Sequence, residues 1–392
     1  MIIPRYGPTY QFDDLARAWQ MCLTTDPLAL LMGRLSKLFA IKHVFLFSGA
    51  RVALYVVLKA YGRPGDVILP AYNCIVVPEA ILYAGYHPVF VDIGDCTFNM
   101  TAGAVEEAVT RTTSVILLTH QFGIPCDVQE ILRICRRHGI LAVEDIAPAL
   151  GATIDGELVG RFGDAAILSF HNTKVVSGGI GGALLTNSDD LAHKVSAVME
   201  NAVRHDACIC SFAKCAVWGA AMTPVLYPAV SLGHQLLRGE MGFQMVESHA
   251  DEPPDFLTTC SRFSAALVAL QLDRLESNLS RRRELARRYA NGLYGCKILA
   301  LPVVGSNSSP AWIQYPLIVN DRRSFCRYMK SRGIDPSWTF RYLCTDSFGL
   351  VGFPNARRAA HATVGLPTYP SLSDQKAGYV CSVAQSASKE LQ

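Results

Sequence analysis

The stretch at residues 167–187 reads ILSFHNTKVVSGGIGGALLTN and places one lysine between two apolar runs. The runs, Ile167–Phe170 and Ala183–Thr186, have the composition of buried β-strands. Lys174 follows the first run, and a turn with almost no side chains, Ser177–Gly182, leads into the second. Most lysines are simply solvated surface residues. The rest of the chain has to show whether Lys174 has a chemical role.

The composition is that of a globular protein with a large core. The chain has 392 residues, of which 50% are hydrophobic and 18% charged. This length allows one large domain with a smaller companion. The formal net charge is only +3, and no basic stripe with interleaved aromatic residues is present, so nucleic acid is not an expected partner.

Thirteen cysteines are scattered along the chain, and none of them forms a CxxC pair. Zinc sites and disulfide frameworks usually show paired spacings. We therefore expect reduced, mostly buried thiols and no metal site. The odd number of cysteines and an N-terminus without a charged-then-apolar leader, MIIPRYGPTYQFDD, together predict a cytoplasmic protein.

Short apolar runs alternate with helical stretches between about residues 40 and 190. The predicted strands are His43–Phe47, Asp66–Leu69, His87–Val91, Ser114–Thr119, Leu141–Glu144, Ala165–Ser169 and Ala183–Thr186. The predicted helices between them include Arg51–Ala60, Ile75–Tyr83, Thr101–Val109 and Val128–His138. This alternation predicts an α/β fold whose mostly parallel central sheet is covered on both faces.

Four residues follow the predicted carboxyl ends of these strands: Gly49, His120, Asp145 and Lys174. Ligands of parallel sheets bind outside the carboxyl ends of the strands. We therefore expect these residues to share one edge of the sheet, which argues against a merely solvated Lys174.

The chain is expected to have three parts: an N-terminal segment (1–40), a large domain (41–260), and a connecting helix with a small C-terminal α/β domain (261–392). The connecting helix is predicted as a single element, Phe263–Leu293, with the arginines of ESNLSRRRELARR on a solvated face. The N-terminal residues could join the small domain.

Residues 207–237 form an unusually apolar segment that is interrupted by Lys214, Pro224 and Pro228. A bilayer span is not expected, because lipid offers no partners to the backbone groups that a broken helix frees. An apolar stretch of this length would promote aggregation if it stayed exposed, so it must pack against another surface. We expect it to be packed within the protein, near the active-site entrance or at a dimer seam. The alternative is a surface that meets a membrane or a greasy substrate.

An acid, a lysine and a phosphate cradle at one sheet edge are what pyridoxal phosphate requires. A lysine amine bonds to the aldehyde of this cofactor, and a carboxylate keeps its ring nitrogen protonated. Asp145 ends an apolar strand and precedes Lys174 by 29 positions. Phe47–Leu54 reads as a strand end, a glycine and a helix start, which suits a phosphate group.

At this point the chain resembles the pyridoxal phosphate-dependent sugar aminotransferases of the DegT–StrS type, which have fold type I. The resemblance covers residues 40–200 strongly and later blocks more weakly. The matching stretches are SGARVAL (48–54), GDVILPAYNC (65–74), AGYHPVFVDI (84–93), THQFG (119–123), VEDIAPALGA (143–152), GRFGDAAILSFHNTK (160–174), AALVALQL (265–272) and LPTYPSLSD (366–374). These blocks occur in the order of the family.

The resemblance implies a role for individual residues. Lys174 falls on the Schiff-base lysine of the family, and Asp145 on the acid that faces the pyridine nitrogen. Ser169 matches a phosphate-binding serine, and Gly49 and Ala50 match the phosphate-cup turn. His120 matches a histidine near the cofactor. The resemblance also implies a homodimer, because fold-type-I sites are completed by the neighbouring subunit.

Several departures mark an atypical subfamily. Pro148 stands where the family has a glutamine that bonds the cofactor, and Cys74 stands where an aromatic residue stacks on the ring; Tyr72 or Phe122 could replace that aromatic. Ile180 occupies an acidic position of the glycine turn. Leu257-Thr258-Thr259 replaces an Asn-x-Arg that reaches the phosphate of the other subunit, and Arg51 could supply the missing charge.

The expected function is transfer of an amino group, with glutamate as the donor by analogy with the family, to a keto-sugar nucleotide in polysaccharide or secondary-metabolite synthesis. Sugar 3-dehydratases of the same family carry a histidine in place of the lysine, so Lys174 argues against that branch. Two alternatives stay open. One is an aminotransferase for a keto-cyclitol or a lipid-linked ketone, which the apolar segment would suit. The other is a non-catalytic regulatory protein that keeps the fold.

Overall fold

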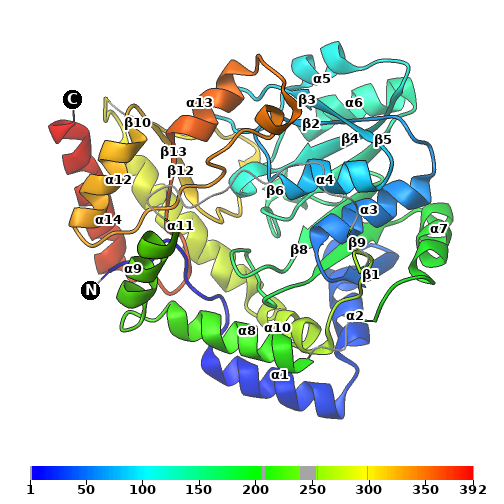
Figure 1. Cartoon of the computed structure of the whole chain (residues 1–392), viewed down its shortest axis with the longest axis horizontal. Coiled ribbons are helices and arrows are strands. Elements are labelled where there is room, and N and C mark those ends of the chain that lie inside the picture. Colours follow the sequence, from blue (N-terminus) through cyan, green and yellow to red (C-terminus); the bar gives the residue numbers. More distant parts are fainter. Residues whose placement is uncertain (1, 205–207, 239–252, 254, 298, 392) are drawn as a thin grey trace.

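The computed structural model describes residues 2–204, 208–238, 253, 255–297 and 299–391. Its centre is a seven-stranded sheet in the order β1-β9-β8-β5-β4-β2-β3 (Figure 1). These strands are β1 (His43–Phe47), β2 (Asp66–Pro70), β3 (His87–Val91), β4 (Thr113–Thr119), β5 (Leu141–Asp145), β8 (Ala165–Ser169) and β9 (Gly182–Thr186). All seven predicted strands are present, so the prediction of an α/β fold is confirmed.

The sheet is parallel except at one end. Strands β8, β5, β4, β2 and β3 run parallel to one another, whereas β9 runs antiparallel to both β8 and β1. Both faces are apolar and covered, as the alternation of side chains along β4 illustrates. Val115 and Leu117 belong to one buried cluster, and Ile116 and Leu118 belong to the other.

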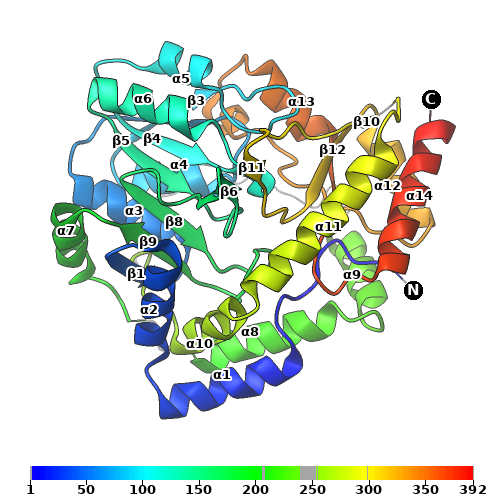
Figure 2. The same cartoon turned by 180° about the vertical axis from the view of Figure 1, so that it is seen from behind.

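Helices from different parts of the chain cover the two faces (Figures 1 and 2). One cluster includes side chains of α3 (Ala50–Tyr61), α4 (Val76–Tyr83) and α7 (Asp189–Met199). The other cluster includes side chains of α2 (Pro27–Phe39), α5 (Ala102–Ala108) and α6 (Val128–His138). A short 3-10 helix, η1 (Gln121–Gly123), follows β4.

The C-terminal region has its own small antiparallel sheet, β10-β12-β13. Its elements are β10 (Leu299–Ala300), β12 (Tyr315–Val319), α12 (Arg322–Ser331), η2 (Cys344–Phe348), α13 (Pro354–Ala362), β13 (Thr363–Leu366) and α14 (Asp374–Glu390). A third small sheet joins β6 (Thr153–Ile154), β7 (Glu157–Leu158) and β11 (Ser308–Ser309).

The first 40 residues divide between these regions. Ile3 pairs with Ile334, and Arg5 forms an ion pair with Asp335, so the chain start lies on the C-terminal region. Helix α1 (Phe12–Thr24) packs instead against α10 (Arg262–Leu272), and α2 packs against the same helix.

The predicted single helix Phe263–Leu293 is wrong, because the chain breaks after Leu272 into α10 and α11 (Leu275–Leu293). The two helices meet different partners: α10 is buried among α1, α2 and α8, and α11 runs along α14 (Figure 2). Arg282 of α11 also contradicts the predicted solvated face, since it is only 2% exposed. Its guanidinium donates to Asn278 Oδ1 at 2.7 Å and to the carbonyl oxygen of Trp312 at 3.2 Å. Burial lowers the pKa of Arg282 to about 10.

The apolar segment folds into two successive helices, α8 (Cys208–Ala221) and α9 (Tyr227–Arg238), which we call the α8–α9 segment; residue 207 lies outside the described residues. Part of α8 is packed against α1 and α10. Other side chains of the α8–α9 segment are exposed: Ile209, Val217, Val225, Leu226, Val230 and Leu232. No helix within the described ranges is both long enough and apolar enough to cross a membrane.

A close approach of two backbones fixes the start of α3 against the start of β9. The Gly181 N–H donates to the Ser48 carbonyl oxygen at 2.9 Å. A Cβ at Gly182 would lie 2.4 Å from the Gly49 carbonyl carbon and 2.5 Å from the Ala50 nitrogen. Gly181 has a φ of +125°, which favours glycine as well. The glycine turn therefore exists to let β9 pass directly beside the helix start.

We expect Gly182→Ala to lower the free energy of unfolding by about 1–3 kcal/mol, because the new methyl group would force backbone atoms apart. Gly49→Ala is the matched control. A Cβ at Gly49 meets nothing within 4 Å, and its φ of −175° is ordinary extended backbone. Its cost should stay below about 1 kcal/mol. Equal destabilisation of the two variants in urea unfolding would contradict this interpretation.

Candidate active site

A cavity of about 820 Å³ lies at the carboxyl ends of the central strands. Its wall on the sheet side includes Thr119 at the end of β4, Asp145 at the end of β5 and Ser169 at the end of β8. Six of the eight predicted site residues line it: Gly49, Ala50, Arg51, Asp145, Ser169 and Lys174. The structure thus brings together residues that are up to 125 positions apart in the sequence.

Lys174 lies in the turn between β8 and β9, where its N–H donates to the His171 carbonyl oxygen at 3.0 Å. The side chain is half-buried in the cavity wall. Burial lowers the pKa of Lys174, although the negative charge of Asp145 and the Cys74 thiol oppose the shift. A lysine with a lowered pKa has a larger neutral fraction at neutral pH, and the neutral amine is the nucleophile.

Asp145 is 4% exposed and fixed at the end of β5. The Ala147 N–H donates to its Oδ1 at 3.0 Å. Burial raises the pKa of Asp145, and the Ala147 hydrogen bond, Lys174 and His120 counteract that rise. A cationic group bound in the cavity would therefore stabilise the ionised carboxylate.

The start of α3 forms an anion-binding corner of the cavity. Gly49 is the N-cap residue, and no side chain caps the helix. Backbone N–H groups and the positive end of the helix dipole consequently remain available for an anion. Arg51 adds a charge here, and its guanidinium lies 5.6 Å from the centre of the Phe256 ring. Ser169 contributes a hydroxyl to the same cavity.

His120 does not line the cavity, contrary to the expectation of a cofactor contact. It is fully buried, and both ring nitrogens have partners within the protein. The Cys126 N–H donates to Nδ1 at 3.1 Å, which places the proton on Nε2, 3.3 Å from Glu144. This position supports a structural role beneath the cavity floor, next to Asp145.

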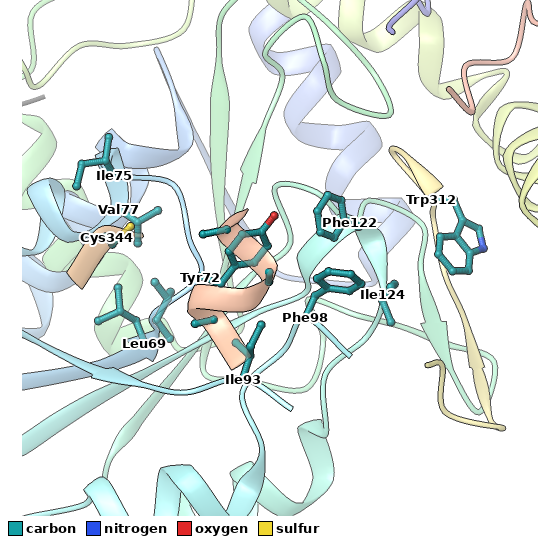
Figure 3. Close-up of a cluster of buried hydrophobic side chains, with 14 of the residues drawn as sticks. Leu69, Tyr72, Ile75, Val77, Ile93, Phe98, Phe122, Ile124, Trp312 and Cys344 are labelled. Carbon is teal, nitrogen blue, oxygen red and sulfur yellow. The ribbon is translucent and has the colours of Figure 1, made fainter. Parts of the chain in front are cut away.

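Tyr72 is also outside the cavity wall, so its position does not support ring stacking in place of Cys74. Figure 3 shows it among Phe98, Phe122 and other buried apolar side chains. Its hydroxyl donates to the Thr339 carbonyl oxygen at 3.2 Å. Phe122, the other aromatic considered for this role, does line the cavity.

Three of the four departures from the family pattern, Cys74, Pro148 and Ile180, line the cavity, whereas Leu257-Thr258-Thr259 does not. Burial raises the pKa of Cys74, which keeps its thiol protonated. Each of these three departures therefore replaces a polar or aromatic contact with an apolar or neutral one at the site itself.

Another part of the cavity wall consists of residues that the sequence did not reveal. It comprises Arg5, Tyr6, Ile313, Gln314 and the run Trp338–Tyr342. These come from the N-terminal segment and the C-terminal region, and nothing in their local pattern places them near strands β5 and β8. The aromatic and basic run SWTFRY, at residues 337–342, is the one sequence signal that could have indicated a binding loop.

The comparisons with known proteins agree with this geometry. The model of the DegT/DnrJ/EryC1/StrS aminotransferase family matches residues 27–211 and 249–385. The GDP-perosamine synthase of Caulobacter vibrioides is 40% identical over 157 residues, which are 40% of this chain and 42% of that protein. The dTDP-4-dehydro-2,3,6-trideoxy-D-glucose 4-aminotransferase of Saccharopolyspora spinosa is 29% identical over 350 residues, 88% of this chain and 84% of that protein.

A solved structure shows the same fold over the whole chain. The putative sugar aminotransferase of Streptococcus pneumoniae in its PLP form superposes with a TM-score of 0.78 at 21% identity, covering 100% of both chains. The prediction of the family from the sequence blocks is confirmed, and the chain is an aminotransferase of a pyridoxal phosphate-dependent group. It belongs to the DegT/DnrJ/EryC1/StrS aminotransferase family.

Proposed function

We propose that the protein binds pyridoxal phosphate through Lys174 and transfers an amino group from an amino donor, glutamate, to a keto-sugar nucleotide. The observation that carries this proposal is the single cavity that joins Lys174, Asp145 and the uncapped start of α3. The names of the two relatives, both of which refer to nucleotide sugars, support the substrate class.

The residues present fit the cofactor. The lowered pKa of Lys174 suits attack on an aldehyde, and the buried carboxyl of Asp145 suits a cationic ring nitrogen. The α3 start, with Arg51 and Ser169, suits a phosphate group. When bound, the cofactor supplies an electron sink for the carbon whose bond is broken.

The residues of this chain then have separate tasks. Nζ of Lys174 takes a proton from the substrate carbon and later returns one, as general base and general acid. Asp145 holds the ring nitrogen protonated and also stabilises the charged form of Lys174. The C-terminal wall shields the proton transfer from bulk water. A keto-cyclitol and a lipid-linked ketone remain the acceptors to test beside keto-sugar nucleotides.

We expect Lys174→Ala to abolish turnover while the protein stays folded, since both the covalent attachment and the proton transfer depend on this amine. Borohydride reduction of the wild-type protein, followed by peptide mapping, should find the cofactor on Lys174. Lys194→Ala serves as the control, because Lys194 is an exposed helix residue paired with Asp190. A label on any other lysine would refute the assignment.

The pH dependence of Lys174 reactivity tests the electrostatics without the reaction itself. Because burial lowers the pKa of Lys174, cofactor-free protein should be acetylated at Lys174 at a lower pH than an unfolded peptide that contains the same lysine, as read by mass spectrometry. Asp145→Asn removes a charge that raises this pKa, so the midpoint for Lys174 should move to still lower pH. A midpoint that stays or rises in Asp145→Asn means that the two groups do not interact.

We also propose that the protein is a cytoplasmic homodimer whose interface includes the exposed side of the α8–α9 segment. All thirteen cysteines are free thiols, which supports a reducing compartment. Val217 and Val225 are 68% and 84% exposed, and apolar side chains clustered in this way favour a partner surface over water. A second copy of the chain offers the same apolar surface, and two-fold pairs are the commonest closed assembly. Peripheral membrane contact is the competing outcome.

We expect the double variant Val217→Glu, Val225→Glu to sediment as a monomer under conditions where the wild type is a dimer, because each copy would bury two uncompensated charges. Val303→Glu is the control, since Val303 is an exposed valine outside the α8–α9 segment. A double variant that stays dimeric excludes the α8–α9 segment from the interface. Binding of the wild type to liposomes, lost in the double variant, would favour the membrane instead.

A further inference from the structure

Gln314 lines the active-site cavity and has a buried side-chain donor without a partner in the described part of the chain. Its side chain is 1% exposed, and its Nε2 has no hydrogen bond among the described residues. Three other described side chains have a buried polar atom in this condition: Trp218, Thr345 and Thr363. Of these four, Gln314 is the one that lines the cavity. An unmet buried donor costs the folded protein stability, so its retention calls for an explanation.

The backbone that carries Gln314 is held from two sides. The Ala311 N–H donates to the Gly123 carbonyl oxygen at 2.9 Å, and the Ile313 N–H donates to that of Phe122 at 3.1 Å. From the other side, the buried guanidinium of Arg282 donates to the carbonyl oxygens of Trp312 and Ile313 at 3.2 and 3.4 Å. The backbone that leads to Gln314, directly before β12, is therefore fixed in position.

The side-chain amide is also held. The Thr339 hydroxyl donates to Oε1 at 2.7 Å and lies 3.3 Å from the Ser337 hydroxyl, which in turn contacts the Tyr6 hydroxyl at 3.0 Å. A Cβ at Gly365 would lie 2.6 Å from Oε1, so only glycine leaves room for the amide there. With Oε1 occupied in this way, Nε2 is the polar atom of this side chain that has no hydrogen bond within the described residues.

The surroundings of Gln314 favour an anionic ligand group. Arg5 and Arg341 line the same wall of the cavity. Arg5 is held by three hydrogen bonds to Asp335, at 2.9, 2.8 and 2.7 Å, which offset its charge. The Arg341 guanidinium lies 4.5 Å from the centre of the Trp338 ring. Guanidinium groups donate hydrogen bonds to oxygen-rich, negatively charged groups, and these groups also accept from an amide N–H.

We propose that Nε2 of Gln314 donates a hydrogen bond to an anionic oxygen of the substrate and makes Gln314 a specificity-determining residue. This inference rests on the proposed aminotransferase function, in which two substrates carry such oxygens. They are the carboxylates of the amino donor and the diphosphate of the keto-sugar nucleotide. The chemistry is shared, and binding of separate probes distinguishes the two sources.

The experiment measures binding of glutarate and of inorganic pyrophosphate to the holoenzyme by calorimetry. Gln314→Leu removes the donor, and Gln314→Glu replaces it with a negative charge. We expect Gln314→Leu to weaken one or both probes by about 10- to 100-fold, the range for a hydrogen bond to a charged group. Gln314→Glu should weaken the same probe further. Thr345→Val is the matched control, because it removes a different buried polar group without a partner among the described residues, a hydroxyl that does not line the cavity. This variant should bind both probes as the wild type does.

The pattern of loss assigns the source. Loss for glutarate alone places the donor carboxylate at Gln314, and loss for pyrophosphate alone places the diphosphate there. Equal binding by the wild type and both Gln314 variants, or failure of the wild type to bind either probe, overturns the proposal. The melting temperature without ligand separates binding from a structural role. Gln314→Leu also removes the acceptor of the Thr339 hydroxyl, so we expect a decrease of at most about 4 °C. A larger decrease would mark Gln314 as structural and overturn the proposal. These readouts stand even if the cofactor is not found on Lys174.

Discussion

The contact on which the site depends is the passage of the Gly181–Gly182 backbone against Gly49–Ala50. At 2.4 Å from a backbone carbon, no side chain fits at Gly182, so this contact is available only to glycine. It sets β9 antiparallel between β1 and β8 and puts the start of α3 beside the ends of β5 and β8. The turn that joins β8 to β9 carries Lys174. The start of α3 and Lys174 thus line one cavity, next to the point where the two backbones touch.

Burial shifts the pKa values of two titratable groups of the cavity, Lys174 and Asp145. The same desolvation lowers the pKa of Lys174 and raises that of Asp145, while their mutual attraction limits both shifts. Each group is consequently closer to its neutral form than it would be in water, and each is stabilised in its charged form by a suitable bound partner. The part of the wall with Arg5, Arg341 and Gln314 carries two guanidinium groups and a buried amide donor. The cavity therefore joins residues at the strand ends, among them Asp145, to residues of the N-terminal segment and the C-terminal region.

Much of the sheet and the residues at its strand ends could be predicted from the sequence, because their signals are local. Apolar runs of strand length identify the seven strands of the main sheet. Residues that follow the carboxyl ends of parallel strands lie where ligands of such sheets bind. The break after Leu272 could not be read in this way, since α10 and α11 are both helical and only their different packing partners separate them. The prediction that Arg282 lies on a solvated face was wrong for a related reason. Its sequence neighbours are charged, but its hydrogen-bond partners are the carbonyl oxygens of Trp312 and Ile313, about 30 positions away. Gln314 owes its position to those same distant contacts.

One residue of the cavity wall, Arg5, is connected through Asp335 to the start of α9. The Tyr227 hydroxyl at the start of α9 donates to Asp335 Oδ2 at 2.5 Å, and this carboxylate also binds Arg5. Asp335 is 2% exposed, so separating it from either partner would leave a buried charge without compensation, which is strongly unfavourable. Any partner that shifts α9 must therefore either carry Arg5 with it or break this cluster. The start of α9 is thus hydrogen-bonded to the same carboxylate that holds Arg5 in the cavity wall.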